Sequence, residues 1–83
     1  MIRVLYFARL REALGSDGED IQAGDIDTVA ALKASLAARG GVWQAEFADN
    51  PRLLASVNQD MAGADTAIAD GDEVGFFPPV TGG

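Results

Sequence analysis

The last six residues, Pro78-Pro79-Val80-Thr81-Gly82-Gly83, could take part in chemistry without any reactive side chain. The two prolines favour a stiff, extended exit from the preceding strand, and six residues at about 3.3 Å each span roughly 20 Å. Gly82 and Gly83 lack a Cβ, so they fit a channel too narrow for other residues. A carboxylate at Gly83 is a poor electrophile, but joining it to AMP gives a mixed anhydride whose acyl carbon accepts a nucleophile. The segment is therefore typical of a C-terminus whose carboxylate is activated, so that its acyl carbon can be transferred to a nucleophile.

The rest of the chain offers few reactive side chains. It contains no cysteine and no histidine, which excludes disulfide scaffolds, zinc and iron–sulfur sites, and catalysis by a thiolate or an imidazole. Asp70, Asp72 and Glu73 lack the spacing of a cation-binding loop, so we expect them to shape a turn. We expect no metal site and no cofactor bound by the chain itself.

The charge balance bears on partners and location. Thirteen acidic against six basic residues give a net charge of -7 and a pI near 4.1, which disfavours nucleic acid as a partner. No apolar run approaches the roughly 18 residues that a membrane span needs, so we expect no membrane contact and a cytoplasmic location. The acidic residues suit either a basic partner or simple solubility.

The first third of the chain predicts a hairpin with an elaborated loop. Residues 2–7 are apolar and β-branched, with Ile2, Val4 and Tyr6 on one face. A helical turn over 10–14 is expected to stop at Gly15. Residues 16–20 have turn composition, and a short second strand is expected over 21–23.

The middle of the chain predicts the main helix. Val29, Leu32 and Leu36 recur at helical spacing, Asp27 or Thr28 can cap the N-terminus, and Gly40 can end the helix. A shorter helix is expected over 42–48, where Trp43 and Phe47 lie one turn apart and belong to the core or to a lid on it.

The remaining elements complete one domain. Strands are expected over 53–57 and 74–77, with a turn region over 58–64, brief pairing over 66–68 and a turn at 70–71. The order predicts an α+β roll in which one main helix crosses a mixed sheet. If its topology is the ubiquitin-like β-grasp, the first and last strands are central neighbours. The domain would cover residues 1–79, and residues 80–83 would form a flexible, extended tail.

Three segments resemble a known family. They are Val4-Leu5-Tyr6-Phe7-Ala8-Arg9-Leu10-Arg11-Glu12, Ala55-Ser56-Val57-Asn58-Gln59, and the ending from Asp70-Gly71-Asp72-Glu73-Val74 to Phe76-Phe77-Pro78-Pro79-Val80-Thr81-Gly82-Gly83. Together they are similar to the small, sulfur-carrying subunits of molybdopterin synthase, the MoaD family. The stretch from 40 to 52 matches no motif of that family.

The resemblance implies a sulfur carrier. A ubiquitin-activating-like adenylyltransferase would use ATP to adenylate Gly83, which would then become a thiocarboxylate. Val80, Thr81 and Gly82 would enter a channel in the large subunit of molybdopterin synthase, where sulfur is delivered to a pyranopterin precursor. The catalytic side chains would belong to that large subunit, in a heterotetramer with two large subunits at its centre.

Three residues are candidates for docking onto that partner. Phe77 lies opposite Val74 and Phe76 by strand alternation and next to the tail, so it is the best interface anchor, although it could merely cover the sheet. Phe7 and Arg11, from the neighbouring strand and the turn after it, would extend the patch and match the partner-binding face of the family.

Other function classes remain open at this point. A ubiquitin-type protein modifier would use the same activation but join Gly83 to a lysine of another protein. A plain β-grasp interaction module would make the tail incidental, since the pair Gly40-Gly41 shows that two glycines can simply end a helix. Thiazole-forming sulfur carriers also end in Gly-Gly, but the approach Phe-Phe-Pro-Pro-Val-Thr resembles the molybdopterin branch.

Overall fold

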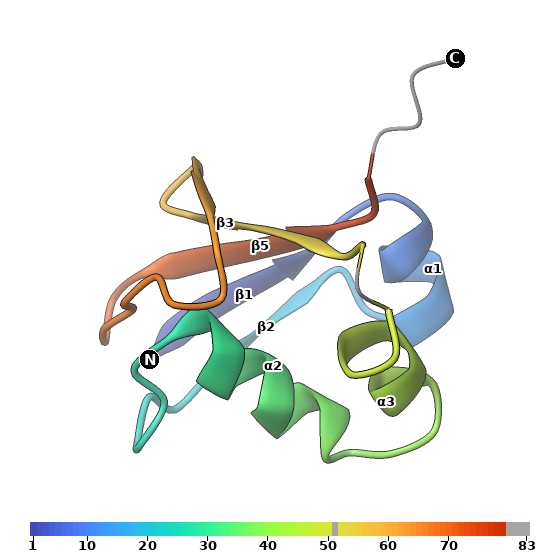
Figure 1. The fold of residues 1–83 in the computed structure, drawn as a ribbon, viewed down its shortest axis with the longest axis horizontal. Coiled ribbons are helices and arrows are strands. Elements are labelled where there is room, and N and C mark those ends of the chain that lie inside the picture. Colours follow the sequence, from blue (N-terminus) through green and yellow to red (C-terminus); the bar gives the residue numbers. More distant parts are fainter. Residues whose placement is uncertain (51, 80–83) are drawn as a thin grey trace.

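The structure, a computed structural model, describes residues 1–50 and 52–79. Apart from β4, which lies where a turn region was predicted, its elements follow the predicted order of strands and helices (Figure 1). In chain order they are β1 (Ile2–Tyr6), α1 (Arg9–Leu14), β2 (Gly18–Ile21), α2 (Val29–Ala37), α3 (Val42–Phe47), β3 (Leu54–Val57), β4 (Asp60–Ala62) and β5 (Glu73–Phe77).

The strands form one mixed sheet in the order β2-β1-β5-β3-β4. β1 and β5 run parallel at its centre, with Tyr6 opposite Phe76, and the other pairs are antiparallel. Figure 1 shows α2 and α3 against one face of this sheet, while the opposite face carries no helix among the described residues. The predicted β-grasp roll, with the first and last strands as central neighbours, is confirmed.

The main helix forms for the reasons its sequence suggests. Val29, Leu32 and Leu36 are almost completely buried against the sheet. The Thr28 hydroxyl, rather than Asp27, caps the helix by accepting a hydrogen bond of 3.1 Å from the backbone N–H of Ala31. The helix ends at Ala37 with Ala38 as its C-cap, earlier than the predicted stop at Gly40, which follows in a left-handed conformation with φ of 78°.

Aromatic side chains join α3 to the sheet. Phe47 is buried and lies 5.1 Å, centroid to centroid, from Phe76 in an edge-to-face arrangement. Trp43 stacks on Phe47 at 5.9 Å and meets the ring of Tyr6 edge-on at 5.6 Å. The expectation that Trp43 and Phe47 belong to the core or cover it is confirmed.

Strand β2 begins earlier than predicted. The expected turn over 16–20 and strand over 21–23 are wrong in their bounds, because β2 covers Gly18–Ile21. Gly18 pairs with Leu5, and a Cβ on Gly18 would lie only 2.7 Å from the carbonyl oxygen of Val4. A residue that resembles a turn signal therefore serves a close approach of two strands.

Strand β4 lies inside the predicted turn region 58–64. Asn58 and Gln59 have φ of 49° and 72°, which makes a two-residue hairpin loop and lets Asp60–Ala62 fold back on β3. The brief pairing predicted over 66–68 is confirmed by an isolated bridge between Thr28 and Ala67.

Candidate functional site

The predicted site residues divide into two groups. Val80, Thr81, Gly82 and Gly83 lie outside the described residues, so their roles stay predictions. Phe7, Arg11 and Phe77 are described, and all three lie at the end of the sheet where β1 and β5 finish. The structure therefore shows the position and exposure of the three predicted docking residues, whose role in docking stays a prediction.

Strand β5 separates a core face from an open face. Val74 and Phe76 are completely buried on the helix side, whereas Phe77 points to the opposite side and is only half-buried. It lies opposite Leu54 in the register of β3 and β5. Pro78 and Pro79 follow at once and end the strand as predicted, because proline has no N–H for the ladder.

Phe7 follows β1 directly and remains tied to β5. Its backbone N–H donates a hydrogen bond of 3.1 Å to the carbonyl oxygen of Phe76. Its side chain is 46% exposed, a large exposed fraction for a phenylalanine in a domain with a well-packed core. Because Tyr6 and Phe76 are register partners, Phe7 and Phe77 both leave the sheet at the same end.

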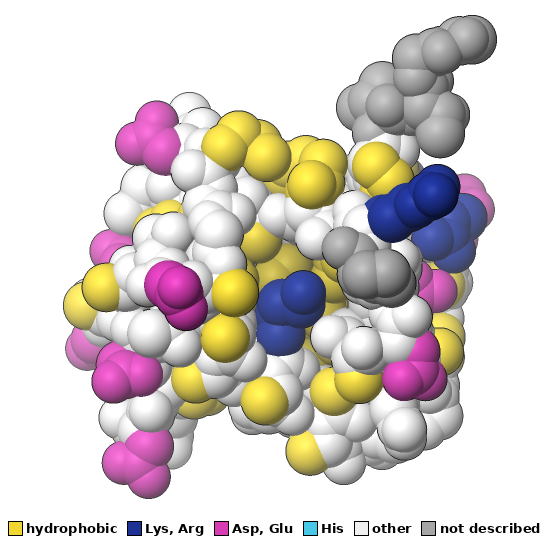
Figure 2. Space-filling model, viewed as in Figure 1, with side chains coloured by type: hydrophobic (Ala, Val, Ile, Leu, Met, Phe, Trp, Pro, Cys, Tyr) yellow, Lys and Arg dark blue, Asp and Glu magenta, His cyan; other side chains and the backbone are white. Residues whose placement is uncertain are grey.

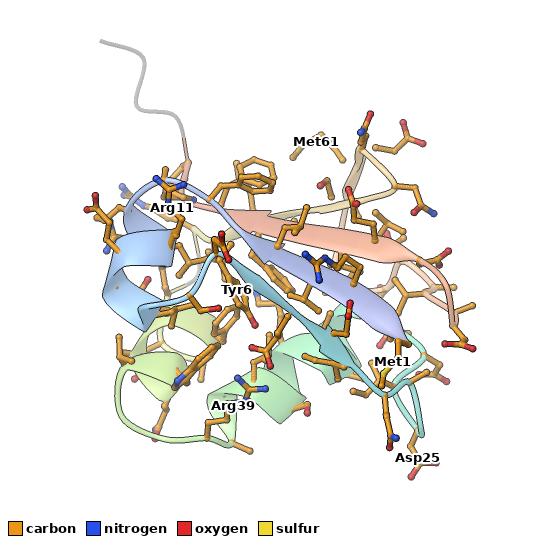
Figure 3. The ribbon with its side chains drawn as sticks, turned by 180° about the vertical axis from the view of Figure 1, so that it is seen from behind. Met1, Tyr6, Arg11, Asp25, Arg39 and Met61 are labelled. Atoms are coloured by element: carbon orange, nitrogen blue, oxygen red, sulfur yellow. The ribbon has the colours of Figure 1, made fainter. Side chains whose placement is uncertain are left out.

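Arg11 projects from α1 at that end. Figure 3 shows Arg11 on α1 beside the end of β5, and α1 contacts β5. Its side chain is exposed and forms no ion pair with any residue in the described ranges. The neighbouring Arg9, by contrast, lies 3.4 Å from the carboxylate of Glu46 on α3. The guanidinium of Arg11 is thus available to an acidic group of a partner.

The structure adds apolar residues that the sequence analysis missed. Met61 on β4 is 65% exposed, and Figure 3 places it on the side of the sheet away from α2 and α3. Figure 2 shows hydrophobic side chains gathered along the top of the view, above β3 and β5. We call this surface the open sheet face, and its apolar members are Leu5, Phe7, Leu54, Met61 and Phe77.

Strand alternation predicts the position of Leu5, on the face opposite Ile2, Val4 and Tyr6, and could also have identified Leu54. Leu5 alternates with Val4 and Tyr6, and Leu54 alternates with Leu53 and Ala55. Met61 could not be assigned in this way, because β4 itself was not predicted.

Asp70 and Asp72 shape the turn before β5, as predicted, whereas Glu73 already belongs to the strand. Asp72 accepts hydrogen bonds from the backbone N–H of Ala69 at 2.9 Å and from the side-chain amide of Asn58 at 3.1 Å. The bond from Asn58 is the main reason that the pKa of Asp72 lies below its usual value. Asp70 pairs with the amino group of Met1. These contacts fix the entry into β5.

Two hollows of the surface lie beside α2, and Leu54 of the open sheet face lines the second. One of about 290 Å³ lies between α2 and α3, and a second of about 230 Å³ lies between α2 and the β3–β4 hairpin. Lys33 lines both hollows, while Phe7, Arg11 and Phe77 line neither. Within residues 1–50 and 52–79, no group of three or more acidic side chains could hold a metal ion.

The described part of the predicted site is therefore an exposed apolar sheet face with an arginine, unpaired among the described residues, at one end, which fits the predicted docking role without testing it. An open apolar sheet face with an exposed arginine at one end offers what an interface core and its polar rim require. The strand at its centre, β5, leads directly into the last six residues of the chain.

No helix in the described part of the chain is long and apolar enough to cross a membrane.

Comparisons with known proteins give close relatives. The model of the ThiS family matches residues 4–83. The chain is 48% identical, over the full length of both proteins, to the molybdopterin synthase sulfur carrier subunit of Escherichia coli K12.

Solved structures share the fold. The solution structure of the HVO 2177 protein of Haloferax volcanii matches with a TM-score of 0.80 and 29% identity, over 99% of this chain and 85% of that one. The complex of subunits 1 and 2 of molybdopterin-converting factor from Helicobacter pylori 26695 contains a chain that matches with a TM-score of 0.67 and 22% identity, over 99% and 97% of the two chains.

Proposed function

The chain belongs to the ThiS family, and we propose that it is the sulfur carrier subunit of a molybdopterin synthase, working in the cytoplasm. The observation that carries this proposal is the 48% identity, from end to end of both proteins, to a sulfur carrier subunit of that enzyme. The open sheet face that leads into the Gly-Gly ending supports it. The chain acts as a non-catalytic subunit that presents a reactive group to its partner.

The first step activates Gly83. A ubiquitin-activating-like adenylyltransferase binds ATP, and the Gly83 carboxylate attacks its α-phosphate, so that pyrophosphate leaves and an acyl adenylate forms. The carrier itself holds no nucleotide or other cofactor. Hydrosulfide from the sulfur source then attacks the acyl carbon, AMP leaves, and loss of the sulfur-bound proton gives a thiocarboxylate at Gly83. The source of the sulfur lies outside this chain.

The second step delivers the sulfur. The large subunit of the synthase binds the open sheet face, with Phe7 and Phe77 as apolar anchors and Arg11 paired with an acidic group. Val80, Thr81 and Gly82 then enter the active-site channel of that subunit and bring the thiocarboxylate to the pyranopterin precursor. The catalytic side chains belong to the large subunit, and the assembly is a heterotetramer.

A protein modifier would share the activation step but form an amide with a lysine of another protein. The full-length relative is a sulfur carrier subunit, which favours sulfur transfer over conjugation. The two outcomes differ in mass and in the protein that carries the product, so one experiment separates them.

Intact mass spectrometry tests the proposal. We expect incubation with the adenylyltransferase, ATP and a sulfur source to change the carrier mass by the exchange of one oxygen for one sulfur. Addition of the large subunit and the precursor should then restore the original mass. Absence of any change in the carrier would refute sulfur loading, and a lysine-linked adduct would favour the modifier.

A truncated chain provides the control. Deletion of Gly83 should abolish loading, while the circular dichroism spectrum and the melting temperature stay unchanged, because the proposal assigns this residue no part in the core. Unfolding of the truncated chain would contradict that assignment.

A further inference from the structure

One glycine is buried on the face of the sheet that otherwise lies open. Gly75 lies in the middle of β5, between Val74 and Phe76, so strand alternation directs it away from the helices. It is nevertheless buried, and no helix among the described residues covers that face. Something else must cover Gly75.

The cover is the ring of Phe7, together with Ser56. A Cβ built on Gly75 would lie 2.9 Å from Cε2 of Phe7 and 3.0 Å from the Oγ of Ser56. Both distances are shorter than ordinary contacts between non-bonded heavy atoms, which lie near 3.5–4.0 Å. The register partner of Gly75 on β1 is Leu5, two residues before Phe7. The Phe7 ring therefore reaches Gly75 diagonally across the two neighbouring strands.

We propose that Gly75 is a positioning residue for docking: its missing side chain leaves a slot that is occupied by the Cε2 edge of the Phe7 ring. This inference rests on the proposed function, in which the open sheet face binds the large subunit. The slot sets how far Phe7 rises above the sheet relative to Phe77, and hence the shape that the partner must match.

A side chain at position 75 would lift the ring without disturbing the fold. Phe7 is 46% exposed, so its ring can swing into solvent, and the helix side of β5 would keep its buried Val74 and Phe76. An interface core is packed as densely as a protein interior, so a displaced aromatic anchor costs affinity. Gly75 therefore acts on binding through Phe7.

A double-mutant cycle tests this coupling. The affinity of the purified large subunit is measured for the native carrier, Gly75→Ala, Phe7→Ala and the double variant. We expect Gly75→Ala to weaken binding by about 10-fold in the native background and to have almost no effect when Phe7 is already alanine. The melting temperature of Gly75→Ala should stay within a few degrees of the native value.

Gly63→Ala is the matched control. Gly63 has no left-handed φ, and a Cβ there would meet no atom within 4 Å, so this variant reports the general effect of replacing glycine by alanine. It should bind the large subunit as the native carrier does. Equal weakening by both variants would overturn the proposal.

A fluorine label on Phe7 makes the movement visible. With 4-fluorophenylalanine at position 7, Gly75→Ala should shift the ¹⁹F resonance of that ring in the free carrier. If Gly75→Ala does not fold, the variant Ser56→Ala/Gly75→Ala replaces it, because it removes the second close contact.

The possible outcomes are distinct. An unmoved resonance, unchanged affinity, or an undiminished effect in the Phe7→Ala background would each overturn the role of Gly75. Failure of the native carrier to bind the large subunit would instead refute the proposed function.

Discussion

Arg39 donates two hydrogen bonds, of 2.7 and 2.8 Å, to the carboxylate of Glu19 on the edge strand β2. The same carboxylate accepts a hydrogen bond of 2.8 Å from the buried hydroxyl of Tyr6. The Arg39 guanidinium also lies 4.4 Å from the centre of the Trp43 ring. These contacts tie β2 to β1, to α3 and to the loop after α2.

Glu19→Gln should change the pH dependence of stability. The hydrogen bonds from Arg39 are the main reason that the pKa of Glu19 is lowered in the folded chain. A lowered folded pKa gives stability that is present above the unfolded value, about 4.3, and that is lost as the pH falls through the folded value. We expect the free energy of unfolding of the native chain to be about 1 kcal/mol larger than that of Glu19→Gln at pH 7. Urea unfolding should show this difference vanishing in strong acid, and a difference independent of pH would contradict the role of the charge.

Arg39→Lys should destabilise the chain although the charge is kept. The planar guanidinium of Arg39 forms two hydrogen bonds to Glu19 and also lies over the Trp43 ring. The ammonium group of a lysine cannot make both contacts at once. We expect a loss of about 1 kcal/mol in the free energy of unfolding. Arg3→Lys is the matched control, because Arg3 makes a single exposed contact of 3.3 Å with Asp20 and should lose almost nothing. Similar losses in both variants would show that the paired geometry is unimportant.

Ala8→Gly should stabilise the chain. Ala8 precedes α1 with φ of 55° and ψ of -134°, and Gly41 precedes α3 with almost the same angles, 56° and -131°. This region suits glycine and costs other residues on the order of 1–3 kcal/mol. We therefore expect Ala8→Gly to raise the free energy of unfolding by about 1 kcal/mol, after the entropy cost of glycine is subtracted. Gly41→Ala should lower it by about 1–3 kcal/mol. Thermal unfolding of both variants measures whether the two changes in stability have opposite signs. Destabilisation by Ala8→Gly would contradict the inference that the backbone of Ala8 is strained.

The sequence alone was enough to predict the buried face of an element where its apolar residues recur with a clear period. Ile2, Val4 and Tyr6 alternate along β1, and the apolar spacing of α2 places Leu32 and Leu36 in the core. Such patterns predict which face of an element is buried. The central pairing of β1 with β5, which the structure shows, was predicted only on the condition that the topology is the β-grasp.

The sequence was insufficient where a residue acts through a distant neighbour. Gly18 reads as a turn signal, but its close approach to Val4 depends on the register of two strands. The exposure of Met61 depends on a hairpin made by left-handed Asn58 and Gln59, which are not glycines. The contact of Gly75 with Phe7 likewise depends on which strands are neighbours. Local composition carries none of this information.

Phe77→Asp should separate docking from folding. Phe77 is half-buried on the open sheet face, so a carboxylate there remains in contact with water in the free carrier, whereas the docked complex would bury it. We expect binding to the large subunit to weaken by at least about 100-fold, while the free energy of unfolding falls by only about 1 kcal/mol.

Phe76→Ala is the contrasting variant, from the next residue of the same strand. Phe76 is completely buried and packs edge-on against Phe47, so its loss should cost about 3–5 kcal/mol of stability. Calorimetric titration with the large subunit, combined with urea unfolding of each free carrier, gives both quantities. If Phe77→Asp loses stability on the scale of Phe76→Ala, and binding falls only in proportion to the unfolded fraction, then Phe77 covers the sheet and does not anchor the partner.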